Sequence, residues 1–309
     1  MRVLYFNNCW FTNVGEAFVD IGGMHLTRLI FPEARIACMS AMTNFYVDLA
    51  AEKENKKSLF NRKSAKNIPL ADMAVRLEAD YVIMPGMFAT EEYLLGAERT
   101  MIDELRKNGT KVIFLGMGGV NYNEKEVDAF KKYLEEIQPA FIMTRDKETY
   151  DNYKNVAPCV SGIDCAFWTV DEFDPRGFAG SEYDIVAFNR SAEPAEFSKW
   201  NRDVIRPWHF QSSYKSRLYN KDILLSDTPY DYLTVYANAS HVYTDLVHAT
   251  IISLMYGVSV KYWYFDKRSL AFDALDNLTK TPDEFFSVDA SSLKTQKERL
   301  AEEIKARFI

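Results

Sequence analysis

The sequence has few cysteines, and none of them stands at a metal-binding spacing. Four occur in 309 residues, namely Cys9, Cys38, Cys159 and Cys165, and no two form a Cys-x-x-Cys pair. This number and spacing give no support for a zinc site, a dithiol redox centre or the disulfide framework of a secreted domain. We therefore expect free thiols, no bound metal and a cytoplasmic location.

Long hydrophobic runs and an excess of positive charge are also missing. No uninterrupted apolar run reaches about 18 residues, so the sequence predicts no membrane span, and the run at residues 3–6 is too short for a signal peptide. The net charge is −7, which disfavours phosphate backbones as partners. The basic cluster at residues 53–66 lacks interleaved aromatic residues. It therefore indicates a solvated loop or helix face, and we predict no nucleic-acid partner.

Known nucleotide and catalytic motifs are absent as well. The sequence contains no Gly-x-Gly-x-x-Gly fingerprint, no Walker lysine, no nucleophile elbow, no paired metal ligands at helical spacing and no set of kinase motifs. Its chemistry must therefore be sought in the loops that the fold brings together.

What the first half does contain is an alternation of short apolar runs and amphipathic stretches. Runs of four or five residues rich in Val, Ile, Phe and Tyr are typical of strands buried on both faces of a parallel sheet. We expect such strands at residues 3–6, 35–39, 81–84, 112–115 and 141–144. We expect helices at residues 16–29, 71–77, 91–108, 124–137 and 146–153.

The alternation breaks between residues 168 and 181, where turn residues gather, and then resumes. We expect further strands at residues 183–188, 223–225, 241–243 and 259–264, and helices at 230–238, 245–256, from 281 and from 292. The helix at 281 is expected because Thr281, Pro282 and Glu284 resemble a helix start.

Length and alternation together predict an α/β fold with two Rossmann-like domains, whose mostly parallel sheets face each other across a cleft. The predicted domains are residues 1–168 and 181–309, joined by a linker at about 169–180. Ligands of such sheets bind beyond the carboxyl ends of the strands, so the loops after strands are the candidate sites.

Glycines follow two strands of the first domain. The first such loop contains Asn13, Gly15 and Glu16, where the glycine would let backbone N–H groups approach an anion or a sugar. Three glycines fall in the second such loop: Gly116, Gly118 and Gly119. They leave room for close approach. A simple turn is an equal alternative for the first loop, whereas one or two glycines would be enough for a turn in the second, so the second loop favours a functional role.

Two cationic residues also follow strands. Arg145 has the planar fork that matches a carboxylate or a phosphate, but a surface salt bridge with Asp146 or Glu148 is an equal alternative. Lys267 lies after the aromatic strand of the second domain, where the alternative is a solvated turn lysine.

His248 is the strongest single candidate. It is expected in the first turn of a helix capped by Thr244 or Asp245, where the helix dipole favours anions. Asp245 lies three residues away, so it would orient the imidazole and favour its protonated form. The alternative is a structural histidine. With Arg145 and Lys267, His248 would form a cationic pocket suited to a small, doubly anionic donor.

Taken in order, these loops resemble the polysaccharide pyruvyltransferase family over roughly residues 1–270. The family's Asn-x-Gly-Asp is matched by residues 13–16, its glycine loop by 116–119, its arginine and acidic pair by 145–146, its Gly-x-Asp-x-x-Phe by 162–167 and its Arg-x-His-Ala by 246–249. Two positions depart from the family pattern. Glu16 replaces an aspartate, and Leu246 replaces an arginine.

The resemblance implies a GT-B-like fold and transfer of pyruvate from phosphoenolpyruvate to sugar hydroxyls, which gives a ketal. It implies His248 as general acid or phosphate ligand, with Arg145 and Lys267 holding the anionic groups, and it requires no metal or cofactor. The first domain would bind the acceptor and part of the donor, and the second domain the donor.

Two alternatives stay open, a GT-B-like glycosyltransferase that uses a nucleotide sugar and a non-catalytic carbohydrate-pathway binding protein. The acceptor sugar and the oligomeric state are not defined by the sequence.

Overall fold

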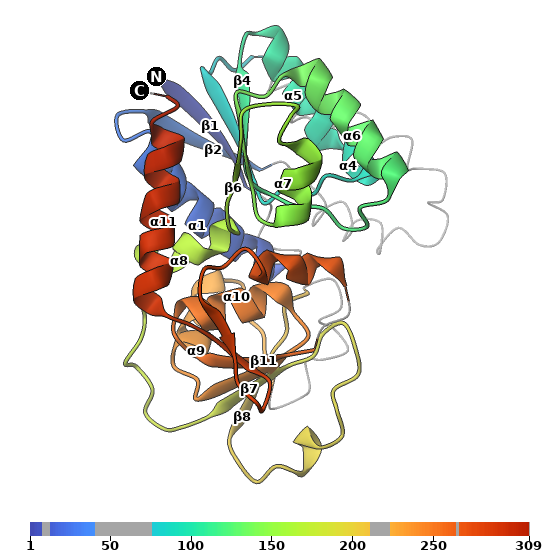
Figure 1. The fold of residues 1–309 in the computed structure, drawn as a ribbon. Coiled ribbons are helices and arrows are strands. Elements are labelled where there is room, and N and C mark those ends of the chain that lie inside the picture. Colours follow the sequence, from blue (N-terminus) through green and yellow to red (C-terminus); the bar gives the residue numbers. More distant parts are fainter. Residues whose placement is uncertain (8–12, 41–75, 211–222, 264–265, 309) are drawn as a thin grey trace, which may run out of the picture.

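The structure is a computed structural model that describes residues 1–7, 13–40, 76–210, 223–263 and 266–308. It contains two sheets, one above the other in Figure 1, with helices packed around and between them. The helix expected at residues 71–77 lies almost wholly outside the described residues.

The first sheet has six strands in the order β2-β1-β3-β4-β5-β6, and every pairing between neighbours is parallel. Its strands are β1 (Arg2–Asn7), β2 (Arg35–Ser40), β3 (Tyr81–Pro85), β4 (Lys111–Met117), β5 (Phe141–Thr144) and β6 (Cys159–Ser161). The five apolar runs therefore form strands as predicted. The order reverses between β1 and β3, so this sheet has a topological switch point there.

The helices of this half are α1 (Val14–Ile30), α4 (Glu91–Leu94), α5 (Ala97–Lys107), α6 (Glu124–Ile137) and α7 (Lys147–Tyr153). The single helix expected at residues 91–108 is two helices, because the chain turns at Leu95 and Gly96 is the N-cap of α5. Helix α6 begins as predicted, with Asn123 accepting a hydrogen bond from the backbone N–H of Glu126 at 2.9 Å.

The second sheet is mixed, in the order β12-β13-β11-β10-β7-β8-β9, with β12 and β13 antiparallel to their neighbours. Its strands are β7 (Asp184–Ala187), β8 (Val204–Pro207), β9 (Ile223–Leu224), β10 (His241–Thr244), β11 (Ser259–Tyr262), β12 (Leu278–Lys280) and β13 (Phe285–Val288). Its helices are α9 (Pro229–Ala237), α10 (Val247–Met255) and α11 (Ala290–Lys305).

The helix predicted to start at Thr281 is wrong, because residues 281–284 form the turn between β12 and β13. The backbone N–H of Glu284 donates to the carbonyl of Thr281 at 2.9 Å, and Glu284 has a φ of 68°. Proline is as suitable in a tight turn as at the start of a helix. The β-forming residues of β13, which pair with β11, decide between the two.

Helix α1 connects the two halves. Its buried side chains belong to one apolar core that includes residues of both sheets, such as Ile113 of β4 and Val260 of β11. An added Cβ at Gly22 would lie 2.0 Å from the carbonyl oxygen of Cys165, so only glycine allows this close packing. Because this one core includes residues of both sheets, it does not mark a boundary between two domains. The predicted domain limits therefore stay a prediction.

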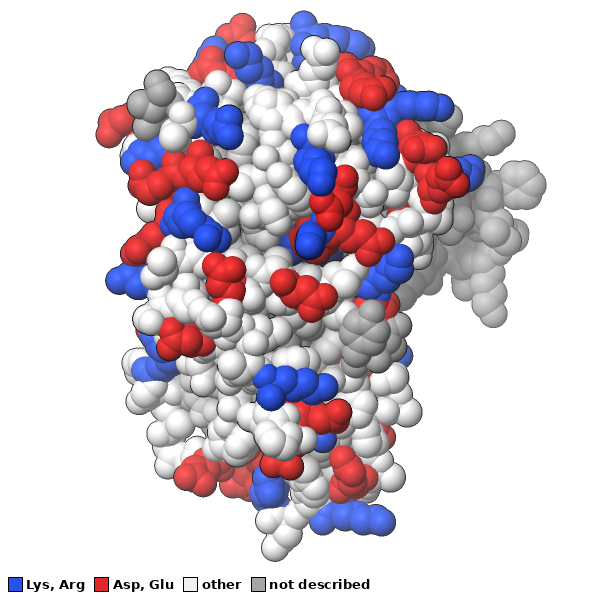
Figure 2. Space-filling model, viewed as in Figure 1, with Lys and Arg blue, Asp and Glu red and all other residues white. Residues whose placement is uncertain are grey.

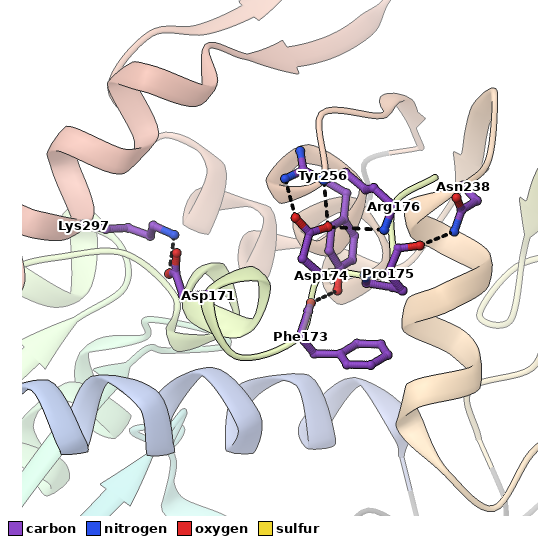
Figure 3. Close-up of polar contacts among 8 residues, drawn as sticks. All are labelled: Asp171, Phe173, Asp174, Pro175, Arg176, Asn238, Tyr256 and Lys297. Atoms are coloured by element: carbon purple, nitrogen blue, oxygen red, sulfur yellow. Dashed lines mark hydrogen bonds and ion pairs between the residues drawn. The ribbon is translucent and has the colours of Figure 1, made fainter. Parts of the chain in front are cut away.

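The segment between the two sheets is fixed on both sides. It begins with two short helices, η2 (Cys165–Trp168) and α8 (Thr169–Glu172), and α8 packs on α1. Figure 3 shows Lys297 of α11 bonded to Asp171, Tyr256 to the carbonyl of Phe173 and Asn238 to the carbonyl of Pro175. Helix α11 thereby returns to the first half, and Figure 1 shows both termini close together.

The surface bears on two of the predictions. Among the described residues, no helix has both the length and the apolar character needed to cross a bilayer. Figure 2 shows acidic and basic side chains interspersed over the face drawn, with no extended basic area outside its grey residues. That pattern is unlike the basic surface of a nucleic-acid-binding protein.

Candidate active site

The candidate site is a cavity of about 130 Å³ where loops from the carboxyl ends of strands in both sheets meet. That volume is the room of about four water molecules. The cavity is lined by Asn13, Glu16, Phe88, Arg145, Arg190, His209, Phe210, Leu246, Val247, His248 and Arg268. A larger hollow of about 720 Å³ lies at the amino ends of β1, β3 and β4, where sheets of this type do not bind ligands.

His248 is the second residue of α10 and lines this cavity. Its Nε2 is buried and has no hydrogen-bond partner among the residues that the structure describes. An added Cβ at Gly15 would lie 2.4 Å from its Nδ1, so Gly15 leaves the space that the imidazole occupies. In this structure, Gly15 therefore positions His248.

The expectation that Asp245 orients and protonates His248 is wrong. The Asp245 carboxylate accepts hydrogen bonds from the backbone N–H groups of Asn189, Arg190 and Ser191 at 2.7–3.0 Å. Burial lowers the pKa of His248, and the nearby carboxylates of Glu16 and Asp164 only partly oppose this. The imidazole is consequently neutral at pH 7 in the free protein.

Asp245 instead fixes the loop that carries Arg190, a residue that the sequence analysis missed. The guanidinium of Arg190 lies 5.5 Å from the centre of the Phe210 ring, and no carboxylate in the described part of the chain forms a salt bridge with it. Burial and the charge of Arg268 lower the pKa of Arg190. An anion bound in the cavity would relieve both effects.

Arg145 lines the cavity from the first sheet, and it forms a buried ion pair. Its Nη1 donates to Asp164 at 3.1 Å, and the two side chains are 3% and 0% exposed. Burial opposes its charge, but Asp164 and other nearby carboxylates outweigh burial and raise its pKa. The predicted alternative partners are not used, because Asp146 caps helix α7 and Glu148 binds Lys267.

The glycine loop makes room for Arg145. An added Cβ at Gly118 would lie 2.3 Å from Nε of Arg145, and Gly116 has a φ of 71°, which favours glycine. The backbone N–H of Gly119 donates to Oη of Tyr122 at 3.0 Å. Here, too, the glycines shape the protein around a functional side chain.

The structure does not bring Lys267 into the cavity. Lys267 binds Glu148 at 3.3 Å and lies over the Tyr122 ring, while its neighbour Arg268 lines the cavity. Asp266 begins a short helical turn, η5 (Lys267–Phe272), and its carboxylate accepts from Nε of Arg268 at 2.8 Å. Lys267 and Arg268 are consecutive residues of this helical turn, so their side chains point in different directions.

His209 also lines the cavity and was missed by the sequence analysis. Its ring contacts Oη of Tyr236 at 2.9 Å. Burial lowers its pKa to about 3, and His248, in the acid range where its imidazole is protonated, adds to this effect. Its carbonyl accepts from the backbone N–H of Val14 at 3.0 Å, so this loop of the second sheet joins the start of α1.

This pKa predicts an acid-dependent loss of stability. Above pH 6.5, His209 is neutral in both the folded and the unfolded protein, so its protonation does not change the free energy of unfolding with pH. Below pH 6.5 only the unfolded state takes up the proton, so the free energy of unfolding should fall by about 1.4 kcal/mol per pH unit until about pH 3. Urea unfolding at pH 7, 6 and 5 measures this slope. His209→Gln should lack this contribution, and equal slopes for the two proteins would contradict the prediction.

Metal ligands do not gather at this site. Within the described ranges, no three His, Cys, Asp or Glu side chains lie close enough together to hold a metal ion.

Comparison with known families gives one sequence match of substantial length. The family model of polysaccharide pyruvyl transferase matches residues 21–260. This range contains Arg145, Arg190 and His248, and it ends before Arg268. No curated protein sequence matches the chain significantly.

Solved structures support the fold. The Staphylococcus aureus MnaA–UDP complex has a TM-score of 0.57 at 10% identity, with 99% of this chain and 90% of that chain covered. The UDP-GlcNAc 2-epimerase of Methanocaldococcus jannaschii has a TM-score of 0.52 at 12% identity, with 98% and 100% covered. The Neisseria meningitidis UDP-GlcNAc 2-epimerase bound to UDP-GlcNAc has a TM-score of 0.54 at 11% identity, with 99% and 94% covered. The predicted GT-B-like fold is confirmed.

Proposed function

Because the chain belongs to the polysaccharide pyruvyl transferase family, we propose that it transfers the pyruvyl group of phosphoenolpyruvate to hydroxyls of a sugar or polysaccharide precursor, which forms a ketal. The observation that carries the proposal is one small cavity lined by three arginines and by a histidine whose Nε2 has no partner among the described residues.

The arginines match the charge of the donor. Phosphoenolpyruvate carries a carboxylate and a phosphate, and guanidinium groups bind both kinds of oxygen in a bidentate manner. Arg190 has no salt-bridge partner among the described residues. Arg268 pairs with the partly exposed Asp266 beside the cavity. These two are the residues we assign to the anionic groups. Arg145 is paired with Asp164, so it would contribute less charge at the cavity wall than the other two arginines.

The reaction needs one proton on the donor and two hydroxyls of the acceptor. A proton is added to the methylene carbon of phosphoenolpyruvate, and the neighbouring carbon becomes electrophilic. One sugar hydroxyl attacks that carbon, the C–O bond to phosphate breaks, and a second hydroxyl closes the ketal. Of the two hydroxyl protons, one balances the proton given to carbon and the other leaves with phosphate.

His248 is the residue we assign to protonation of the methylene carbon. It is neutral in the free protein because burial lowers its pKa. A dianion beside it would raise that pKa, so binding of the donor would itself load the proton that the reaction uses. Charge neutralisation comes from the arginines, and the scheme invokes no metal ion or organic cofactor.

Leu246 fits this assignment. It occupies the position where the family pattern has an arginine, is 4% exposed, and is the N-cap residue of α10. Arg190 and Arg268 approach the same cavity from other loops. We infer that their charges replace the one missing at position 246.

Donor binding can be tested by thermal unfolding with phosphoenolpyruvate and, separately, with a panel of nucleotide sugars. A ligand at about 100 times its Kd stabilises the folded state by about 2.7 kcal/mol. We expect a shift with phosphoenolpyruvate. A shift with a nucleotide sugar alone would favour a glycosyltransferase, and no shift with either ligand would favour a non-catalytic binding protein.

A pair of adjacent variants then tests the site. Arg268→Ala should weaken phosphoenolpyruvate binding by about tenfold or more, because it removes a charged hydrogen-bond donor and leaves Asp266 facing the anion. Lys267→Ala, one residue away and outside the cavity, should change the Kd less than about threefold. Isothermal titration calorimetry measures both. Equal effects of the two substitutions would exclude the arginine assignment.

A further inference from the structure

The two faces of the second sheet are covered unequally by the rest of the protein. Alternate strand residues such as Ile185, Val242 and Val260 belong to the main core, which includes α9 and α10. The residues between them belong to a separate small cluster, with Val186, Phe188 and Phe197 buried and Tyr243 and Trp263 packed against it. Among the described residues, the segment around η3 (Phe197–Lys199) covers this second face, and Figure 1 shows α9 and α10 on the side toward the first sheet.

The second face therefore carries partly exposed aromatic rings instead of a helix layer. The ring of Trp200 lies 4.9 Å from that of Tyr243, and the ring of Phe285 lies 5.5 Å from that of Tyr243. The guanidinium of Arg202 lies over the Trp200 ring, 4.6 Å from its centre. Trp200, Tyr243 and Phe285 each keep part of their surface exposed to solvent. Buried neighbours such as Phe197 hold the rings in place.

A groove of about 560 Å³ lies along these rings. This volume is within the range of small-molecule binding sites and is about four times that of the cavity described above. Besides the aromatic residues, its wall contains polar groups: Glu196, Lys261, Asp283 and Glu284. Glu196, Asp283 and Glu284 are exposed at the rim. The carboxylate of Glu284 also lies 3.8 Å from Nζ of Lys261 and 3.6 Å from Nζ of Lys280.

We propose that this groove binds the glycan acceptor, at sugar units beyond the one that receives the pyruvyl group. The choice of a glycan rests on the proposed function. A pyranose ring has an apolar C–H face, which packs against aromatic rings, and a rim of hydroxyls, which bind carboxylates and an ammonium group. The lining has three carboxylates and one lysine, and Lys280 and Arg202 lie beside it, on Glu284 and Trp200. The groove therefore has no excess of positive charge that would attract nucleic acid or an anionic lipid surface.

The position of the groove agrees with an acceptor that reaches both places. Tyr243, at the groove, is in register with Val186 of β7. Arg190, at the cavity, lies four residues beyond Val186, and β7 ends at Ala187, so the two residues are at most about 13 Å apart. Phe188 and Trp263, whose rings are 5.0 Å apart, belong to the aromatic cluster on the same face of the sheet. A chain of a few sugar units spans that distance.

Titration calorimetry with linear gluco-, galacto- and manno-oligosaccharides of one to six units tests the proposal without donor. We expect at least one series to bind the wild-type protein, with affinity that rises with chain length. Trp200→Ala should weaken that binding about tenfold, because one stacking surface is lost. The exposed double substitution Glu196→Lys with Asp283→Lys should weaken it similarly, and it leaves the aromatic cluster intact.

Tyr230→Ala is the matched control, because Tyr230 is an exposed aromatic residue on α9, away from the groove. It should bind oligosaccharides like the wild-type protein. Absence of binding in all three series, or unchanged binding in both groove variants, would overturn the proposal. So would a wild-type dimer, seen by sedimentation, that the double substitution dissociates, since the groove would then be a subunit contact.

The two proposals fail separately. Oligosaccharide binding that depends on Trp200, together with no binding of phosphoenolpyruvate, would support the groove and refute the donor assignment. Binding of phosphoenolpyruvate without any oligosaccharide binding would do the reverse.

Discussion

His248→Gln should slow pyruvyl transfer by about 10²- to 10⁴-fold, the range expected when a general acid is lost. Glutamine keeps a side chain that fits beside Gly15, where an added Cβ would lie 2.4 Å from the imidazole Nδ1, so the cavity should keep its shape. Phosphoenolpyruvate should still bind within about threefold of the wild-type Kd, because the arginines carry most of the anion binding. Phosphate release and calorimetry measure the two quantities.

Proton uptake provides a second readout for His248. Since burial keeps the imidazole neutral in the free protein, a dianion that raises its pKa must draw a proton from the buffer. Calorimetry near pH 7 in buffers of different ionisation enthalpy should show this uptake in the wild-type protein and not in His248→Gln. A variant with normal turnover and a weakened Kd would instead assign His248 to phosphate binding.

Asp164→Ala should lower the free energy of unfolding by about 3–5 kcal/mol, which is the usual cost of leaving a buried charge without its partner. Arg145 and Asp164 are almost completely buried, and Asp164 also accepts from the backbone N–H of Ala166 at 2.9 Å. Urea unfolding measures the loss. The double variant Arg145→Met with Asp164→Leu should recover much of it, because it removes both charges and keeps most of the volume.

The single variant Asp164→Ala also tests whether donor binding affects stability. With Asp164 removed, the guanidinium of Arg145 is the buried cation left unpaired beside the cavity. Phosphoenolpyruvate should therefore stabilise Asp164→Ala more than it stabilises the wild-type protein. A loss of less than about 1 kcal/mol, or equal stabilisation of the two proteins, would show that Asp164 is not what balances Arg145.

The sequence was informative wherever a pattern repeats within a few residues. Short apolar runs placed the strands of the parallel sheet, because strands covered on both faces are apolar throughout. Arg145 and His248 could be found because each directly follows such a strand, and the carboxyl ends of parallel strands converge. The same reasoning reached Lys267 but not Arg268, since the direction of adjacent side chains depends on a helical turn that begins at Asp266.

The contacts missed from the sequence are those between distant segments. Asp245 is three residues from His248, yet it binds backbone groups more than fifty residues away. Nothing near Asn189 or Arg190 indicates that partner, since the loop has ordinary turn composition. The helix predicted from Thr281 and Pro282 was wrong for a different reason. They suit a turn as well as a helix, and the pairing of the following strand with β11 decided the outcome.

The single apolar core that joins both sheets through α1 affects how the protein can be made. During synthesis, β1, α1 and the rest of the first sheet leave the ribosome before α10 and α11 exist. The side of α1 that contacts those two helices stays uncovered until α10 and α11 have been translated. The close contact between Gly15 and His248 can thus form only after α10 has been made, long after α1.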